Sequence, residues 1–176
     1  LQFVEVRYAG NVFSPGRSDG YVPAVNLTGA TDLLLVDALV RDSDWSGVAI
    51  GSGTPTLTNV QVLRARSDAF RGALGAAPVL TNLTALDTGG DRYALDAGDL
   101  TVDRTWWMGG LPIEMYGSIY IAGGATLTIA PGQVVKLSHG EYITVENGTL
   151  IAVGEPERPI VFTSWRDDTV GGDSGI

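Results

Sequence analysis

Three aspartates near the end of the sequence are the residues best suited to binding an ion. Asp167, Asp168 and Asp173 lie in one short polar stretch, and glycines separate the last carboxylate from the first two. Calcium takes about six to eight oxygen ligands, which carboxylates and the backbone carbonyls of a glycine-rich loop can supply. The spacing is not that of an EF-hand loop, and the closing glutamate is missing. The stretch therefore predicts either a calcium site or an acidic surface turn without an ion.

Other aspartates have the chemistry that polysaccharide hydrolysis requires. Two sets of acids would form carboxylate pairs if they fell on neighbouring coils of the chain. The first set is Asp19 with residues 41–44, and the second is Asp87 with Asp91. A glycoside hydrolase needs two carboxylates that face one groove. Aspartate is also common in tight turns, where its side chain bonds to nearby backbone. Because no segment gathers acids, lysines and aromatics together, we interpret these residues as turn residues. We expect no catalytic residue, although an enzyme is not excluded.

The histidine and the aromatic residues have simpler interpretations. His139, the only histidine, lies in a predicted turn without the partners that a zinc site or a catalytic triad requires. Four aromatic residues between positions 106 and 120 could stack on sugar rings or pack in the core, and we favour the core. These residues are Trp106, Trp107, Tyr116 and Tyr120. The N-glycosylation pattern Asn-X-Thr occurs at Asn26, Asn82 and Asn147. Asn59 and Asn82 are one repeat apart, which favours an inward stack of asparagines at least as strongly.

A repeat of twenty-odd residues must position all of these side chains. Residues 36–43, 60–67 and 83–90 can be aligned, at intervals of 24 and 23 residues, and a weaker copy at 102–106 follows after 19. Each of the three is followed by a second apolar stretch that contains glycine or alanine. A period of this length indicates a solenoid with one coil for each repeat. Such coils bury their apolar faces only against neighbouring coils, so function is expected on an elongated surface or at the ends.

Composition supports strands and excludes some partners. Apolar residues make up 44% of the 176 residues, charged residues make up 18%, and there are 24 glycines, which favours strands and turns over helices. The net charge of −9 makes nucleic acid a poor partner, because phosphate binding requires a basic face. No apolar run is long enough to span a membrane. The absence of cysteine is compatible with secretion by a prokaryote.

The sequence shows no linker between its two halves, which indicates one continuous domain over residues 1–176. Residues 1–120 read as ordinary coils of 19–24 residues, with an irregular stretch near 99–120. Residues 121–176 read as coils with Pro-Gly and Asn-Gly turns that end in the acidic, glycine-rich loop. The sequence starts inside a predicted strand, which suggests a processed or excised piece.

One segment carries a resemblance to a known family. The string ATLTIAPGQVVKL, followed by ITVENGTLIAVGEPERPIVFTSWRDDTVGGD, resembles the right-handed parallel β-helix repeat proteins of secreted and cell-surface prokaryotic chains. The resemblance implies an all-β fold, a right-handed parallel β-helix with pectate-lyase-like architecture. It is weak for function, because this fold serves adhesins, lyases, hydrolases and passive stalks.

The order of the segments suggests how the protein functions. In the family, a loop like FTSWRDD normally leads into a strand like LQFVEVRYAG, but here the strand comes first and the loop last. We therefore expect an extracellular structural protein, either a repeat module of a longer chain or a protomer that assembles head to tail into a fibre or adhesin. The expected interface buries Leu1, Phe3 and Val4 against Ile160 and Phe162, and calcium at the acidic loop stiffens it. The alternative is a carbohydrate-active enzyme or carbohydrate-binding module, with carbohydrate as the ligand.

Overall fold

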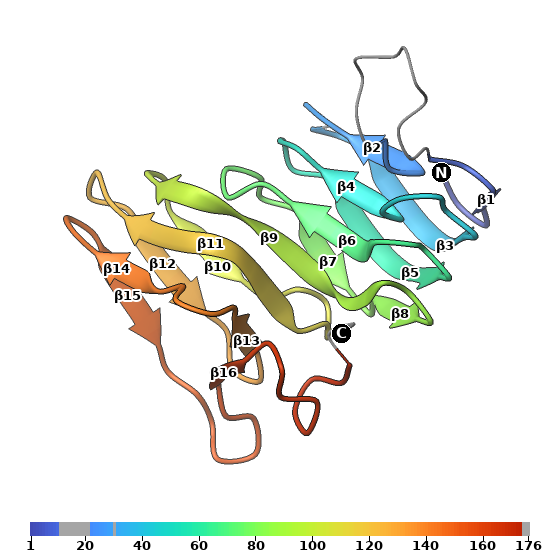
Figure 1. Cartoon of the computed structure of the whole chain (residues 1–176). Coiled ribbons are helices and arrows are strands. Elements are labelled where there is room, and N and C mark those ends of the chain that lie inside the picture. Colours follow the sequence, from blue (N-terminus) through green and yellow to red (C-terminus); the bar gives the residue numbers. More distant parts are fainter. Residues whose placement is uncertain (11–21, 30, 174–176) are drawn as a thin grey trace, which may run out of the picture.

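The computed structural model describes residues 1–10, 22–29 and 31–173, and in this part of the chain the structure is all-β. Short strands wind into a parallel solenoid of about six turns (Figure 1). The strands of the first half are β1 (Glu5–Arg7), β2 (Val25–Leu27), β3 (Leu34–Arg41), β4 (Val48–Ile50), β5 (Thr56–Leu63), β6 (Asp68–Gly72), β7 (Val79–Thr81), β8 (Thr84–Leu86) and β9 (Gly90–Leu100). Those of the second half are β10 (Arg104–Trp106), β11 (Ile113–Ile121), β12 (Thr126–Ile129), β13 (Val134–Leu137), β14 (Ile143–Val145), β15 (Thr149–Ala152) and β16 (Val161–Ser164).

Three parallel sheets form the sides of the solenoid. The longest has the order β16-β13-β11-β9-β6-β4-β2, and β14 also pairs with β11. A second sheet has the order β1-β3-β5-β7, with β8 on β5, and the third has the order β10-β12-β15. The second sheet ends with β8, before the stretch near 99–120 that was expected to be irregular, and the third sheet begins with β10 inside it. The pairing of β9 with β11 shifts register between Tyr116 and Ile119. The described residues include no helix with the length and apolarity that a membrane crossing requires.

The core consists of side chains stacked in register from coil to coil. Along the longest sheet one inward stack runs through five side chains, each at most 1% exposed, which are Val48, Phe70, Tyr93, Ile113 and Val135. Burying each such side chain contributes about 1.5–3 kcal/mol. Neighbouring coils supply this burial to each other, so the repeat seen in the sequence is the repeat of the core.

Two corners of each early coil are made by residues in the left-handed backbone region. Eight described non-glycine residues have positive φ, four on each corner: Phe3, Asp37, Asn59 and Asn82 on one, and Tyr8, Asp42, Arg64 and Asp87 on the other. Asparagine and aspartate tolerate this conformation better than most residues because their side chains bond locally. Asn82 Nδ2 donates to Asn59 Oδ1 at 2.8 Å, and Asn59 Nδ2 donates to Asp37 Oδ1 at 2.7 Å. The predicted asparagine stack is therefore present, but it lies on the exposed outside of the corner rather than inside it.

Candidate functional site

The C-terminal end coil, formed by β15 and β16, exposes apolar side chains that continue the buried stacks. Phe162 pairs in register with Val135, yet Val135 is 0% exposed and Phe162 is 47% exposed. Leu150 is likewise exposed beside the fully buried Leu127. The difference arises because Val135 and Leu127 have coils on both sides, whereas Phe162 and Leu150 have one only. This end of the solenoid is an unfinished apolar surface.

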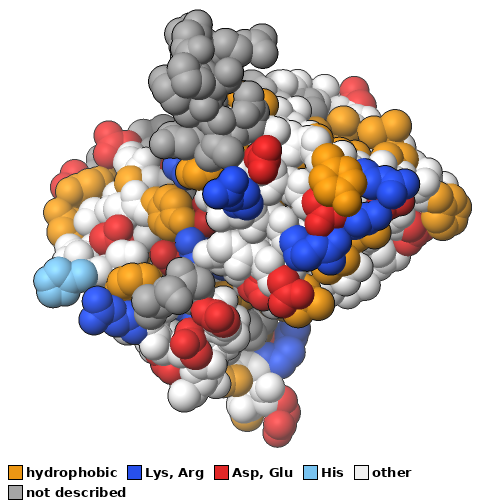
Figure 2. Space-filling view, turned by 45° about the vertical axis from the view of Figure 1, so that its right-hand side comes forward, with side chains coloured by type: hydrophobic (Ala, Val, Ile, Leu, Met, Phe, Trp, Pro, Cys, Tyr) orange, Lys and Arg blue, Asp and Glu red, His pale blue; other side chains and the backbone are white. Residues whose placement is uncertain are grey.

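The N-terminal end coil, formed by β1 and β2, also exposes apolar side chains, but Phe3 and Tyr8 lie on outer corners rather than at the end of an inward stack. Leu1 is 73% exposed and Phe3 is 78% exposed, and Tyr8 is exposed to a similar degree. Phe3 and Tyr8 occupy the left-handed corner positions where the next coils have Asp37 and Asp42. Hydrophobic side chains lie among arginine and acidic side chains on the face turned forward in Figure 2.

The residues predicted to form an assembly interface therefore lie at both ends. Phe162 is half-exposed, and Val4 and Ile160 are half-buried, with Ile160 packed against the core. The sheet order places Phe162 in the same stack as Val25, rather than in line with Leu1 or Phe3. No contact with a second chain tests the interface, which remains a prediction.

Charged residues of alternating sign form a buried row on the outer face of the longest sheet. This charge ladder consists of Asp68, Arg92, Glu114 and Lys136, which lie on β6, β9, β11 and β13. Asp68 is 1% exposed and Glu114 is 4% exposed. Glu114 and Lys136 are direct partners in the register of β11 and β13. Burying charges is costly unless opposite charges and hydrogen bonds compensate, and the alternation supplies this compensation.

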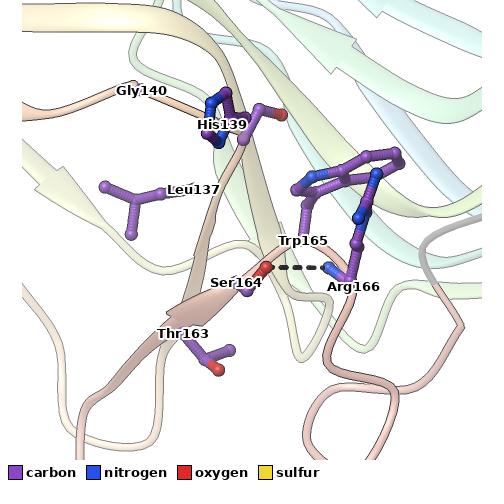
Figure 3. A pocket seen from close by; sticks show the side chains of 8 residues that line it. Leu137, His139, Gly140, Thr163, Ser164, Trp165 and Arg166 are labelled. Carbon is purple, nitrogen blue, oxygen red and sulfur yellow. Dashed lines mark hydrogen bonds between the residues drawn. The ribbon is translucent and has the colours of Figure 1, made fainter.

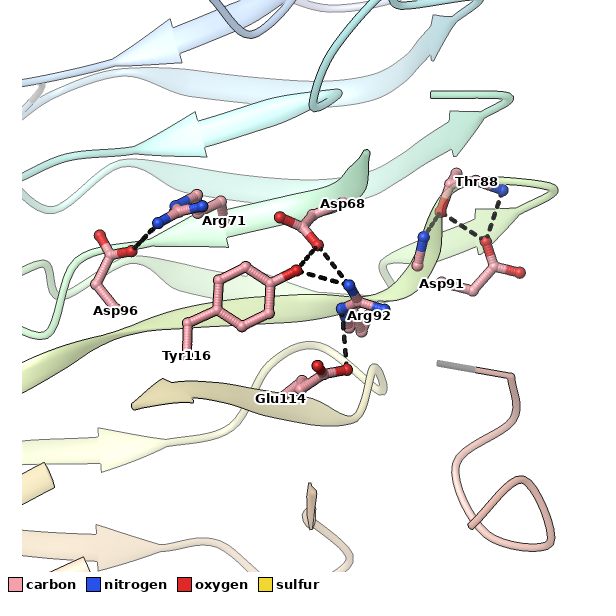
Figure 4. A network of polar contacts seen from close by, with 9 residues as sticks. Asp68, Arg71, Thr88, Asp91, Arg92, Asp96, Glu114 and Tyr116 are labelled. Carbon is pink, nitrogen blue, oxygen red and sulfur yellow. Dashed lines mark hydrogen bonds and ion pairs between the residues drawn. The ribbon is translucent and has the colours of Figure 1, made fainter. Parts of the chain in front are cut away.

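Arg92 is the centre of the charge ladder (Figure 4). Its Nη2 lies 2.9 Å from Asp68 Oδ1, and its Nε lies 3.1 Å from Glu114 Oε2. Tyr116 completes the group: its hydroxyl accepts a hydrogen bond from Arg92 at 2.6 Å and donates one to Asp68 at 2.6 Å. Tyr116 is thus neither a core residue nor a free sugar-stacking platform.

Burial perturbs the proton affinities of this group. It raises the pKa of Glu114 to about 7, although the nearby Arg92 works in the opposite direction. Burial and the adjacent Asp68 carboxylate raise the pKa of Tyr116 to about 12. A carboxylic acid that titrates near neutral pH has the proton affinity of a general acid. Glu114, however, is too deeply covered for a polysaccharide to reach it.

The C-terminal segment folds back over the outer face of the same sheet. Lys136 Nζ donates to the carbonyl of Gly172 at 2.6 Å. Gly171 packs so closely on Pro112 and Val134 that a Cβ at this position would lie 3.0 Å and 3.3 Å from their side chains. The segment therefore covers part of the charge ladder and leaves the outer edge of β16 open (Figure 1).

The three aspartates predicted to bind calcium lie on this segment. Asp167 accepts hydrogen bonds from the hydroxyls of Thr163 and Thr169 and from the Thr169 backbone, and these bonds lower its pKa. Asp168 and Asp173 are exposed. Over residues 1–10, 22–29 and 31–173, no three or more His, Cys, Asp or Glu side chains gather into a metal-ligand group. Calcium binding remains a prediction, and the hydrogen bonds of Asp167 show how the loop is ordered by its own residues.

The other predicted acidic pairs are placed at corners. Asp42 is held between Arg41 at 2.7 Å and Arg64 at 2.6 Å. Asp91 accepts hydrogen bonds from the backbone and the hydroxyl of Thr88, which closes a turn. Asp87 occupies a left-handed corner, and Asp44 is exposed. Asp19 lies outside the described residues. These partners fit the interpretation of the acids as turn residues.

A cavity of about 590 Å³ opens beside the end of β16 (Figure 3). His139 is on one side of it, and Trp165, with the Arg166 guanidinium 5.2 Å from its ring centre, is on the other. The cavity holds no paired carboxylates and no partner for His139 that would make it a catalytic base. It therefore offers apolar and cationic contact surface at the end of the solenoid.

The remaining aromatic residues divide between core and surface. Trp106 is buried, as favoured from the sequence, whereas Trp107 is partly exposed. The hydroxyls of Tyr120 and Tyr142 lie 2.7 Å apart on the surface, with the rings edge to face. This tyrosine pair is an aromatic surface that a sugar ring could contact.

Comparison with known proteins identifies the scaffold. Residues 98–176 match the family model of the pectate-lyase like β-helix domain. This chain is a right-handed parallel β-helix repeat protein. No curated protein and no solved structure matched it. The matched residues run from the end of β9 to the C-terminal segment of the β-helix.

The charge ladder is the feature that the sequence interpretation missed. Its members are 24, 22 and 22 residues apart, which is the repeat interval of the coils. Charges of opposite sign at the repeat interval were therefore a signal of contact between neighbouring coils of the β-helix.

Proposed function

We propose that the protein is an extracellular structural module, part of a β-helix fibre or adhesin, and that further β-helix coils continue it at both ends. The observation that carries this proposal is the exposure of Phe162 at the end of a stack whose inner members are buried. A surface of this kind is stabilised when another coil covers it. At the opposite end Leu1 and Phe3 are also exposed, although Phe3 lies on an outer corner.

The arrangement of the acids favours a structural role over catalysis. A glycoside hydrolase needs two carboxylates accessible to its substrate. The carboxylates gathered on the outer sheet, Asp68 and Glu114, are bound to Arg92 and are less than 5% exposed. The exposed pair Tyr120 and Tyr142 supports carbohydrate binding as the second candidate, without hydrolysis.

Electron microscopy and sedimentation test the proposal. The purified chain should form concentration-dependent filaments in the presence of calcium. If calcium only stiffens the junction between molecules, the filaments should persist after chelation. Phe162→Asp should abolish them, because it places a charge in the apolar contact. Val102→Asp is the matched control, since Val102 is exposed to nearly the same degree but lies between β9 and β10. Dispersed wild-type protein that binds or degrades a polysaccharide would contradict the proposal.

A further inference from the structure

The longest sheet has an open edge at each end of the solenoid. The longest sheet begins with β16 and ends with β2, and among the described strands each of these has one partner only, β13 and β4. All pairings in this sheet are parallel. A second molecule placed along the axis of the first therefore offers its β2 to the free edge of β16 with the correct strand direction.

The register of the sheet fixes which residues meet. One inward stack runs from Val25 at one edge to Phe162 at the other, through pairs that are each in register. The adjacent outward position runs from Asn26 to Thr163 through the same strands. If the next coil keeps this register, Phe162 covers Val25 and Thr163 lies opposite Asn26.

The charges at the outward positions of β2 and β16 are compatible with this contact between two molecules. On the inner strands this outward position holds charged residues mixed with alanines, in the order Ala49, Arg71, Ala94, Glu114 and Lys136. At the two edges it holds the neutral Asn26 and Thr163, so the junction buries no unpaired charge there.

We propose that a second copy of this chain docks head to tail, with its β2 pairing in parallel with β16 and its Asn26 opposite Thr163. This inference rests on the proposed function and specifies its partner and register. The contact joins two different surfaces and does not close on itself, so its repetition generates a filament rather than a dimer.

Because the chain contains no cysteine, engineered cysteines test the register directly. Paired positions on neighbouring strands are about 4.8 Å apart, within the range that a disulfide spans. An oxidised mixture of the single variants Asn26→Cys and Thr163→Cys should give a disulfide-linked dimer. Each variant alone should give none, because its cysteine then faces an unmodified residue.

Thr28→Cys mixed with Thr163→Cys is the matched control. Thr28 is two residues beyond Asn26, which places the two cysteines about 8 Å apart in the proposed register, too far for a disulfide. We expect at least tenfold more dimer from the first mixture than from the control, with unchanged melting temperatures of the reduced variants. Filaments without the Asn26–Thr163 product, or with equal yields from both mixtures, overturn the register but leave the structural function intact. Absence of any assembly overturns both.

Discussion

Replacing Arg92 with methionine tests whether the charge ladder depends on its central cation. The guanidinium is 2.9 Å from Asp68 and 3.1 Å from Glu114, and both carboxylates are almost completely buried. Removing one partner of a buried ion pair costs about 3–5 kcal/mol, because the remaining charge stays buried without compensation. For a chain of this length, each kcal/mol lowers the melting temperature by about 2–4 °C. We expect Arg92→Met to melt about 6–20 °C below the wild type at pH 7.5.

The pH dependence distinguishes this cause from loss of packing. At pH 4.5 the Glu114 carboxyl, whose pKa is raised to about 7 by burial, is protonated in the folded wild type and variant alike. One of the two uncompensated charges is then absent, so the difference between the melting temperatures should shrink markedly. Circular dichroism melts of both proteins at pH 4.5 and 7.5 measure this difference.

Arg66→Met is the matched control for the loss of an arginine. Arg66 lies 3.8 Å from Asp44, and the two side chains are 68% and 61% exposed. An exposed pair of this kind contributes about 0–1 kcal/mol. The reasoning fails if Arg92→Met melts within 2 °C of the wild type, or if its deficit is the same at both pH values.

Three further substitutions test the proton affinity of Glu114, the rigidity of the main inward stack and the backbone requirement at the left-handed corners. The folded-state pKa of Glu114 lies above its ordinary value of 4.5, so over this range the native protein binds more protons than the unfolded chain, and wild-type stability should fall as pH rises from 4.5 to 7. Urea unfolding of Glu114→Gln should not show this fall. If the variant keeps the wild-type pH profile, Glu114 is not the group that causes the fall. Phe70→Ala removes a fully buried ring from the main inward stack and should cost about 3–5 kcal/mol by urea unfolding, whereas a cost below 1 kcal/mol would mean that the stack is not a rigid core. Asn59→Val should cost about 1–2 kcal/mol more than Asn59→Gly, since the residue has a φ of 52°, and equal midpoints would show that the corner adapts.

The fold was predictable because each coil repeats the same physical requirements. The segments beginning at Val60 and Leu83 were aligned correctly, but the structure pairs Val60 with Ala38 rather than with Val36, so the first predicted interval was two residues too long. Asp37, Asn59 and Asn82 recur at the left-handed corner in this corrected register. Asparagine and aspartate tolerate the positive φ of this corner, so their recurrence marks the repeat in the sequence, although Phe3 occupies the same corner in the first coil. The outward direction of the asparagine stack was not predictable, because a polar residue at the repeat interval fits either side of the wall.

The candidate site was less accessible to sequence reasoning. Asp68, Arg92 and Glu114 were not considered together, because each lies within an apolar strand rather than in a turn. Carboxylates in loops were instead interpreted as metal ligands or catalytic residues. In the structure, Asp167 accepts hydrogen bonds from Thr163 and Thr169. Lys136 is covered by the C-terminal segment, whose Gly172 carbonyl it contacts, and no local pattern predicts such a contact.

The charge ladder also explains how the coils keep their order. Apolar stacks alone discriminate weakly between neighbours, since side chains such as Phe70, Ile113 and Val135 are of similar character. Alternating charges discriminate strongly, because placing Arg92 beside Lys136 would bury two like charges together. This specificity is costly, and the pKa of Glu114, raised by burial, reflects the penalty for keeping a carboxylate charged there. The edges of β2 and β16 hold the neutral Asn26 and Thr163 in the row of Glu114 and Lys136, so a further coil can be added there without burying an unpaired charge.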